Sequence, residues 1–197
     1  MIGSRDIVKI ASNLVVVYLV GGVLLAALYA KTSPIIYQNS IKAKKAALEK
    51  IMPEATGIKK LGDWIIHDKK ADYYIAKKDS LPCGYLIESY GKGYSSYIHV
   101  LVAADMDLRI KRIGILSHAE TPGLGDEIET DWFKNQFAKK DAAHMKVIKG
   151  ATDEDIQAIS GATISTRAVT EDAVKNALIY LAHSVKGGAE NGDQSHR

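Results

Sequence analysis

The sequence predicts an α+β protein in which a single N-terminal transmembrane helix precedes one domain of helices packed on an antiparallel sheet. Three observations support this fold class: an uncharged apolar run near the N-terminus, a series of short β-branched and aromatic runs in the middle, and a helical pattern near the C-terminus. The length of 197 residues suits one domain with an anchor better than two full domains.

The apolar run covers residues 10–30 and contains no charged side chain. About 20 helical residues cross the ~30 Å hydrocarbon core of a bilayer. A cleaved signal peptide and a buried core helix are the alternatives, but the apolar region of a signal peptide is shorter, about 7–15 residues. We therefore expect an uncleaved anchor, preceded by a short tail at residues 1–9. Lysine side chains flank both ends of the run, so charge alone leaves its orientation open.

Residues 31–57 are expected to form a helical stalk. Within it, residues 35–51 have an amphipathic pattern, and the apolar positions on one face are Ile41, Ala46, Leu48 and Ile51. Pro53 is expected to end this helix, and residues 53–63 have the composition of a loop. The lysines at positions 42, 44 and 45 suit a solvated face, with binding to acidic lipid headgroups as the alternative.

The middle of the chain predicts five strands separated by Gly, Asp or Pro signals. Their ranges are 63–67, 71–78, 83–90, 95–105 and 108–118, with a hairpin turn at residues 105–107. The tyrosines between Tyr73 and Tyr97 fit strand propensity and cross-strand packing, although one of them could stack on a ligand. A short amphipathic helix beginning at Asp131 is expected to bury Trp132, Phe133 and Phe137.

A long helix is expected after residue 166. Its apolar positions at helical spacing are Val169, Ala173, Ala177, Leu178 and Leu181. Gly187 and Gly188 are expected to end it, which leaves residues 187–197 as a polar, disordered tail. The folded domain would then cover residues 58–186.

The composition excludes several classes of function. A net charge of +3, spread among acidic residues, argues against nucleic-acid binding. A single cysteine, Cys83, allows no intrachain disulfide and no Cys-rich metal cluster. The six histidines lack metal-ligand spacing, so no metal site is expected. The chain also lacks a Walker or dinucleotide-binding signature.

Two loops carry residues suited to ligand binding. Residues 158–166, AISGATIST, place several hydroxyl groups and Gly161 at the start of the last helix, where backbone N–H groups attract an anion such as a phosphate. Simple capping by Ser165 or Thr166 is the alternative. Residues 118–127, HAETPGLGDE, follow the last predicted strand and combine a Pro–Gly turn with a second glycine. Taken alone, this second loop is also explained as an ordinary strand-to-helix connection.

Together, ETPGLG and SGATIST resemble the FMN-binding domain family of two related membrane complexes. Its members include the G subunit of the Rnf ion-translocating ferredoxin:NAD oxidoreductase and the C subunit of the sodium-translocating NADH:quinone reductase. The resemblance covers the anchor, the central strands with Gly84–Tyr85, both loops and the last helix. The short chain and single anchor are closer to the Rnf member of the family.

The resemblance implies that FMN is attached through its phosphate to Thr163, as a phosphodiester made by a separate flavin transferase. No residue of the chain would then be catalytic. The implied contacts with the flavin, its ribityl chain and its phosphate are Glu120, Thr121, Leu124, Gly125, Ser160, Gly161, Ala162, Ile164 and Ser165, with Lys149 and His118 as further candidates. The family often has an acidic residue three positions before the serine, whereas this chain has Gln157 there and Asp155 two positions further back.

The function implied by the resemblance is electron transfer within an Rnf complex, on the extracytoplasmic side of the cell membrane and with a cytoplasmic N-terminus. The implied partners are the other membrane, iron–sulfur and flavin subunits, and the lipid bilayer. Three alternatives stay open: a component of the quinone reductase like its C subunit, a free-standing extracytoplasmic flavoprotein reductase, and an anchored interaction module that binds no flavin.

Overall fold

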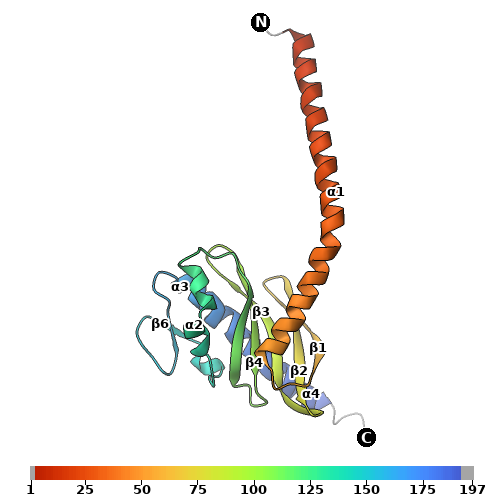
Figure 1. The fold of residues 1–197 in the computed structure, drawn as a ribbon. Helices are drawn as coiled ribbons and strands as arrows, with labels where there is room; N and C mark the ends of the chain where they lie inside the picture. Colours follow the sequence, from red (N-terminus) through yellow and green to blue (C-terminus); the bar gives the residue numbers. More distant parts are fainter. Residues whose placement is uncertain (1–2, 192–197) are drawn as a thin grey trace. The chain divides into compact units, whose positions relative to one another are not determined.

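The computed structural model describes residues 3–191 (Figure 1). The chain divides into two compact units between Lys45 and Ala46. The first contains most of the N-terminal helix, and the second contains the last turns of that helix and the α+β domain. The α+β fold with a long N-terminal apolar helix is thus confirmed.

The N-terminal helix α1 spans Ser4–Ile51 without interruption. Its length and apolar composition are sufficient for a membrane span, and its apolar side chains between Leu14 and Leu28 are exposed. The anchor and the stalk, predicted as separate segments, are therefore one helix. Pro34 lies inside it; proline removes one backbone hydrogen bond, and the helix continues through the neighbouring turns. The helix also includes residues 4–9 of the expected tail, while residues 1–2 lie outside the described part of the chain.

Five antiparallel strands form one sheet in the order β1-β2-β3-β4-β5. Their bounds are Gly57–Ile66 (β1), Lys69–Lys78 (β2), Leu81–Lys92 (β3), Tyr97–Ala104 (β4) and Ile110–Ser117 (β5). All five predicted strands are confirmed, as is the turn at residues 105–107, where the Asp105 carboxylate accepts hydrogen bonds from the Asp107 and Arg109 amides. The predicted loop at residues 53–63 was too long, because pairing with β2 extends β1 back to Gly57.

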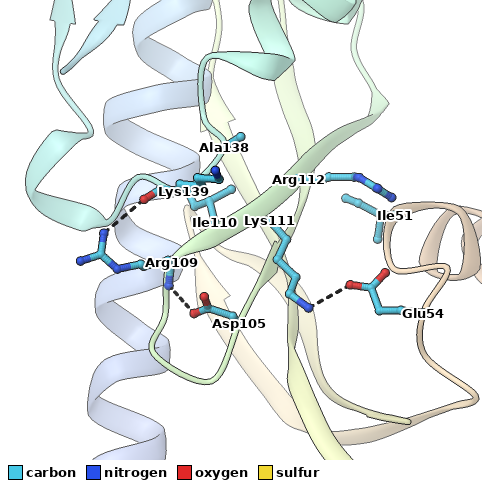
Figure 2. A pocket seen from close by; sticks show the side chains of 9 residues that line it. All are labelled: Ile51, Glu54, Asp105, Arg109, Ile110, Lys111, Arg112, Ala138 and Lys139. Atoms are coloured by element: carbon cyan, nitrogen blue, oxygen red, sulfur yellow. Dashed lines mark hydrogen bonds and ion pairs between the residues drawn. The ribbon is translucent and has the colours of Figure 1, made fainter. Parts of the chain in front are cut away.

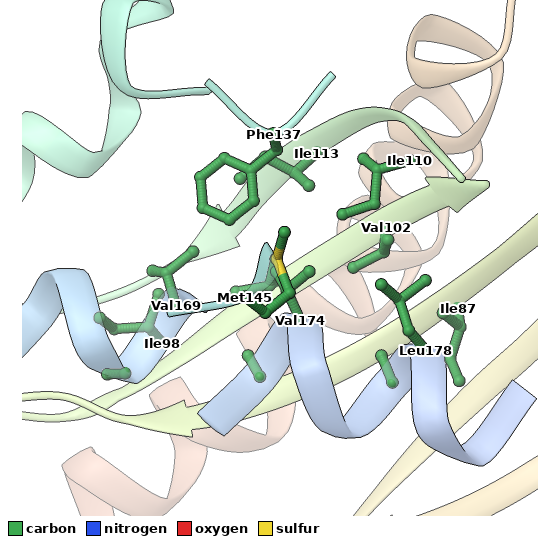
Figure 3. Close-up of a cluster of buried hydrophobic side chains, with 14 of the residues drawn as sticks. Ile87, Ile98, Val102, Ile110, Ile113, Phe137, Met145, Val169, Val174 and Leu178 are labelled. Atoms are coloured by element: carbon green, nitrogen blue, oxygen red, sulfur yellow. The ribbon is translucent and has the colours of Figure 1, made fainter. Parts of the chain in front are cut away.

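One face of the sheet packs against the C-terminal helices. Ile87, Val102 and Ile113 of the strands meet Val174 and Leu178 of the helices in a dense apolar cluster (Figure 3). The opposite face carries a smaller cluster, in which Leu48, Ile51 and Met52 cover Leu86 and Leu101. Of the predicted apolar positions on the stalk, Leu48 and Ile51 are thus buried, whereas Ile41 lies in the other unit and is exposed.

The segment between β5 and the C-terminal helices contains only short elements. They are two 3₁₀ turns, η1 (Gly125–Glu129) and η2 (Ala142–His144), the helix α2 (Asp131–Asn135), and a parallel pair, β6 (Val147–Ile148) with β7 (Ile156–Gln157). Phe133 and Phe137 are fully buried and pack edge to face, with ring centroids 5.2 Å apart. The expected burial of Trp132 was wrong: its side chain is 53% exposed, because adjacent positions on a helix point in different directions.

The C-terminal helical region consists of α3 (Thr163–Arg167), a π-helical segment η3 (Ala168–Val174) and α4 (Lys175–Asn191). The predicted apolar positions from Val169 to Leu181 are all buried against the sheet, as expected. The predicted end at Gly187 was wrong, because α4 continues to Asn191. Glycine weakens a helix by about 1 kcal/mol but does not by itself terminate it. Residues 192–197 of the expected tail lie outside the described residues.

Candidate functional site

The two predicted loops meet in a pocket of about 470 Å³. Three segments form its wall: the β3–β4 connection, the loop after β5, and the start of α3. The lining residues are Tyr94, Glu120, Thr121, Leu124, Gly125, Gly161, Ala162, Thr163, Ile164 and Ser165. Every one of them except Tyr94 belongs to the set predicted from the sequence. The fold therefore brings together positions about 40 residues apart in the chain.

Glu120 is a buried carboxylate that joins the three segments of the wall. Its Oε1 accepts hydrogen bonds from the amides of Ser95 and Ser96, both at 3.1 Å. Its Oε2 accepts from the Tyr94 amide at 3.0 Å and from the Ser165 hydroxyl at 2.5 Å. Burial raises the pKa of this carboxyl, but the hydrogen bonds from Ser165 and the three amides outweigh burial and hold its pKa below the ordinary value. Glu120 is thus an ionised group with four donors.

Small residues allow the two loops to approach each other. A Cβ on Gly125 would lie 2.7 Å from the Glu120 Cβ and 2.9 Å from the Ser165 hydroxyl oxygen. Gly161 has a φ of +79°, in the left-handed region that favours glycine. A side chain there would also meet Leu124 at 3.0 Å. Gly125 and Gly161 are therefore explained by the packing of the pocket wall, whereas Gly123 has open space around it and is explained by its φ of +74°.

The hydroxyl groups at the start of α3 differ in their availability. Ser165 donates to Glu120, and Thr166 donates to the Ala162 carbonyl and accepts from the Ile159 amide. Within residues 3–191, the hydroxyls of Ser160 and Thr163 make no hydrogen bond, and only Thr163 lines the pocket. Thr163 is also half-buried at the first position of α3. Among the hydroxyl-bearing residues of the motif, it alone lines the pocket and has a hydroxyl without a hydrogen bond to any described residue.

Capping by Ser165 or Thr166, the alternative explanation of the motif, was wrong. The helix begins at Thr163, and its N-cap is Ala162, which offers no side-chain hydrogen bond. Ser165 and Thr166 lie inside the first turn instead. The first backbone bond of the helix runs from the Thr166 amide to the Ala162 carbonyl, so the amides of Thr163, Ile164 and Ser165 have no intrahelical acceptor.

Three predicted residues lie outside the pocket lining: Ser160, His118 and Lys149. The Nδ1 atom of His118 accepts a hydrogen bond from the Glu120 backbone amide at 3.1 Å, and its Nε2 atom lies 3.0 Å from the Glu129 carboxylate. It therefore supports the backbone of the loop behind the pocket. Lys149 is exposed in the loop between β6 and β7. Gln157 lies in β7, where its backbone amide donates a hydrogen bond to the side-chain oxygen of Gln136.

Tyr94 is the pocket residue that sequence reasoning did not single out. It was only one of several tyrosines explained by strand packing, but it lies between β3 and β4, and its side chain is 72% exposed. The signal available in the sequence was its position in GKGYSS, between glycine and serine residues typical of a turn. A tyrosine in such a turn has no cross-strand partner to explain it.

Similarity to known proteins shows the class of protein to which this chain belongs. Residues 93–179, which include the whole pocket wall, match the FMN-binding domain family. The fold resembles the crystal structure of NqrC from Shewanella oneidensis, with a TM-score of 0.50 and 24% identity over 64% of this chain and 66% of that one. The chain thus carries an FMN-binding domain behind an apolar helix long enough to span a membrane.

Relatives that align with almost the whole chain identify its family more closely. One is the G subunit of the proton-translocating ferredoxin:NAD(+) oxidoreductase complex of Clostridium ljungdahlii, 34% identical over 89% of this chain and 91% of the relative. Another is the G subunit of the ion-translocating oxidoreductase complex of Methanosarcina acetivorans, 31% identical over 92% of this chain and 98% of the relative. The chain therefore belongs to the family of G subunits of ion-translocating oxidoreductase complexes.

Proposed function

We propose that this chain is a membrane-anchored electron-transfer subunit of an ion-translocating ferredoxin:NAD oxidoreductase complex, and that it carries FMN covalently attached to Thr163. The observation that carries the proposal is the pocket in which the loop of Glu120–Leu124 meets the free hydroxyl of Thr163. Membership of the G-subunit family supports the same function.

The residues of the pocket fit the chemical parts of FMN. A volume of about 470 Å³ lies within the usual range of small-molecule sites, about 300–1,000 Å³. Leu124 and Ile164 are 45% and 53% exposed beside the pocket, and with Tyr94 they offer an apolar and aromatic surface to a flat ring. The amides at the start of α3 suit the phosphate, because the positive end of a helix stabilises an anion.

The chain's own residues would bind and orient the cofactor, while FMN when bound supplies the redox chemistry. Thr163 holds the phosphate, and its hydroxyl does no redox work. Glu120 keeps the Tyr94 turn, its own loop and the start of α3 in fixed positions through its four hydrogen bonds. No residue of the pocket is required as an acid, base or nucleophile in electron transfer.

Covalent attachment suits a cofactor that works outside the cytoplasm. A flavin bound only by weak contacts would be lost by dilution there, whereas a tether keeps its local concentration high whatever its intrinsic affinity. A separate flavin transferase would make the bond, with this chain as its substrate. We place the N-terminus in the cytoplasm, α1 across the bilayer and the FMN domain on the extracytoplasmic side, beside the other membrane, iron–sulfur and flavin subunits.

Intact-protein mass spectrometry of the natively purified chain tests the attachment. The mass should exceed that of the chain by FMN less one water, and the band should fluoresce after SDS denaturation. Thr163→Ala should abolish both signals, because it removes the only uncommitted hydroxyl of the pocket motif that lines the pocket. Thr152→Ala is the matched control, since Thr152 lies in a surface loop and only caps its own turn. A chain that matures beside a flavin transferase without an adduct contradicts the proposal.

A separate observation tests the place of the chain in a complex. A subunit should co-purify from membranes with polytopic and iron–sulfur proteins, whereas a free-standing reductase should purify alone and reduce a small acceptor. Thr163→Ala should still co-purify with those proteins, because the variant keeps the anchor and the fold. This result separates membership of the complex from attachment of the flavin.

A further inference from the structure

A groove runs along the open edge of the sheet, away from the flavin pocket. Its floor is β5, and its walls are the last turn of α1 and the segment that begins with α2. It has a volume of about 360 Å³. A neighbouring cavity of about 300 Å³ shares Ile51, Lys111 and Arg112 with it and extends it toward Arg109 and Lys139 (Figure 2). We call the two together the β5 groove.

The backbone of β5 is unpaired along most of this groove. β5 is the last strand of the sheet, so only one of its edges pairs with β4. At its first residue, the outer edge is closed, because the Ile110 amide donates to the Lys140 carbonyl and the Ile110 carbonyl accepts from the Lys139 amide. From residue 112 to residue 116, no backbone bond to an outer neighbour is formed within the described chain. An open strand edge of this kind is a template for another strand.

The groove combines apolar lining residues with an excess of positive charge. Ile51, Ile113 and Leu116 are among its lining residues, Ile51 in the α1 wall and the other two in the β5 floor. Two of its cations are paired, Lys111 with Glu54 at 2.9 Å and Lys134 with Asp131 at 3.1 Å (Figure 2 shows the first pair). Lys50 and Arg112 are exposed and form no direct ion pair with any described residue, although the Glu54 carboxylate attracts Arg112 through space. The charge left on this edge is therefore positive.

We propose that the β5 groove binds an extended, acidic segment of another protein, which adds to the sheet as a sixth strand beside residues 112–116. Unpaired backbone groups supply the hydrogen bonds of such strand addition, and alternate side chains supply its specificity. The side chains that face the apolar floor would be aliphatic, and those that face Lys50 and Arg112 would be Asp or Glu. Pairing with the added strand would end at Ile110, because the backbone groups of Ile110 are already bonded to Lys139 and Lys140.

The open backbone favours a protein segment over an acidic lipid surface. Lipid headgroups need only the cations, whereas an extended chain also satisfies the amides and carbonyls between residues 112 and 116. The groove is also independent of the flavin pocket, with which it shares no lining residue.

The binding test uses the full-length chain in detergent and a fluorescein-labelled peptide of alternating Val and Glu. A second peptide with the same charge and a central proline is the matched probe, because proline cannot donate to a strand ladder. We expect the first peptide to bind at least about tenfold more tightly than the second. Arg112→Glu should weaken binding by at least about tenfold, or about 1.4 kcal/mol, because the attraction to the acidic side chains becomes a repulsion. Lys59→Glu reverses an exposed lysine on β1 at the opposite edge and should leave binding unchanged.

Amide hydrogen exchange provides the second measurement. The peptide should slow exchange at residues 112–116 and leave β1 unaffected. Equal binding of the two peptides, or binding without this protection, overturns strand addition. The proposal is also overturned if phosphatidylglycerol micelles that carry the same total negative charge as the peptide displace it, and the peptide does not slow exchange at residues 112–116. That result would assign the groove to lipid. Arg112→Gln, which removes the charge but keeps a polar side chain, is used if Arg112→Glu fails to fold. The same assay on Thr163→Ala chains separates this inference from attachment of the flavin.

Discussion

Glu120 illustrates how one side chain organises a binding site at the scale of single residues. The sequence placed it in a ligand-binding loop, and the structure gives its carboxylate four donors from two other segments. A buried carboxylate is costly unless its oxygens are hydrogen-bonded. These bonds are therefore expected to make Glu120 a positioning residue that holds the pocket together before any cofactor is attached.

Removing the Ser165 hydroxyl tests this role. Ser165→Ala deletes the 2.5 Å hydrogen bond to the buried Glu120 carboxylate, and bonds to charged groups contribute about 1.5–3 kcal/mol. We expect the free energy of unfolding in urea to fall by that amount. Ser95→Ala is the control, because Ser95 contributes only its backbone amide and its side chain is exposed. Equal effects of the two substitutions would contradict the assigned role of Ser165.

The charge of Glu120 predicts a dependence of stability on pH. Hydrogen bonds lower the pKa of its carboxyl in the folded chain, so the ionised form stabilises the fold. This contribution is complete above the unfolded pKa, about 4.3, and is lost as the pH falls through the lower folded pKa. The stability difference between wild type and Glu120→Gln should therefore be constant above about pH 5 and shrink toward about pH 3. Urea unfolding at several pH values measures it.

Carboxyls such as Glu54 and Asp141, whose pKa values are also lowered, are present in both proteins and should cancel in that difference. A difference that does not change with pH would mean that Glu120 is not ionised in the folded state.

At the scale of elements, the short helix α2 shows when the spacing of apolar residues predicts burial correctly and when it does not. Phe133 in α2 and Phe137 in the turn that follows it are both buried, as the pattern predicted. Trp132 is large and apolar, and its size suggested burial, but its direction on the helix leaves it half exposed. Hydrophobicity alone does not fix the face of a helix of only five residues, because so short a helix has little periodicity.

This contrast predicts different costs for two aromatic substitutions. Phe133→Ala removes a fully buried ring and should destabilise the domain by about 3–5 kcal/mol. Trp132→Ala removes a larger side chain that is mostly in solvent, and should cost less than about 1 kcal/mol. Thermal unfolding of the two variants by circular dichroism measures both. Similar losses would mean that Trp132 is buried in the working protein.

The sequence predicted the existence of the elements better than their bounds. Alternating and β-branched runs identified all five strands of the large sheet, because side-chain period is a local property, but not the two-residue strands β6 and β7. The extension of β1 to Gly57 depends on pairing with β2, and the continuation of α1 through Pro34 depends on the turns around it. Neither is encoded in the composition of the segment itself. The pocket was predicted through its two motifs, whereas Tyr94 joins it only through the tertiary fold.

On the scale of the whole molecule, the proposed function requires the anchor and the flavin domain to be on defined sides of the membrane. The helix α1 has the length of a span, but the lysines on both of its flanks do not determine its direction. Large domains cross the membrane largely regardless of nearby charge. The side on which the domain lies must therefore be measured directly.

Cysteine labelling in intact cells measures that side. In a Cys83→Ser background, Lys149→Cys places a thiol on an exposed loop of the domain, and Arg5→Cys places one on an exposed residue near the start of α1. We expect a membrane-impermeant maleimide to label Lys149→Cys in intact cells and Arg5→Cys only after permeabilisation, because the bilayer excludes the reagent from the cytoplasm. Each variant is the control for the other, because the same reagent should reach one thiol from outside the cell and the other only from inside it. The reverse pattern would place the pocket in the cytoplasm, where dilution into the medium would no longer explain why FMN is tethered to Thr163.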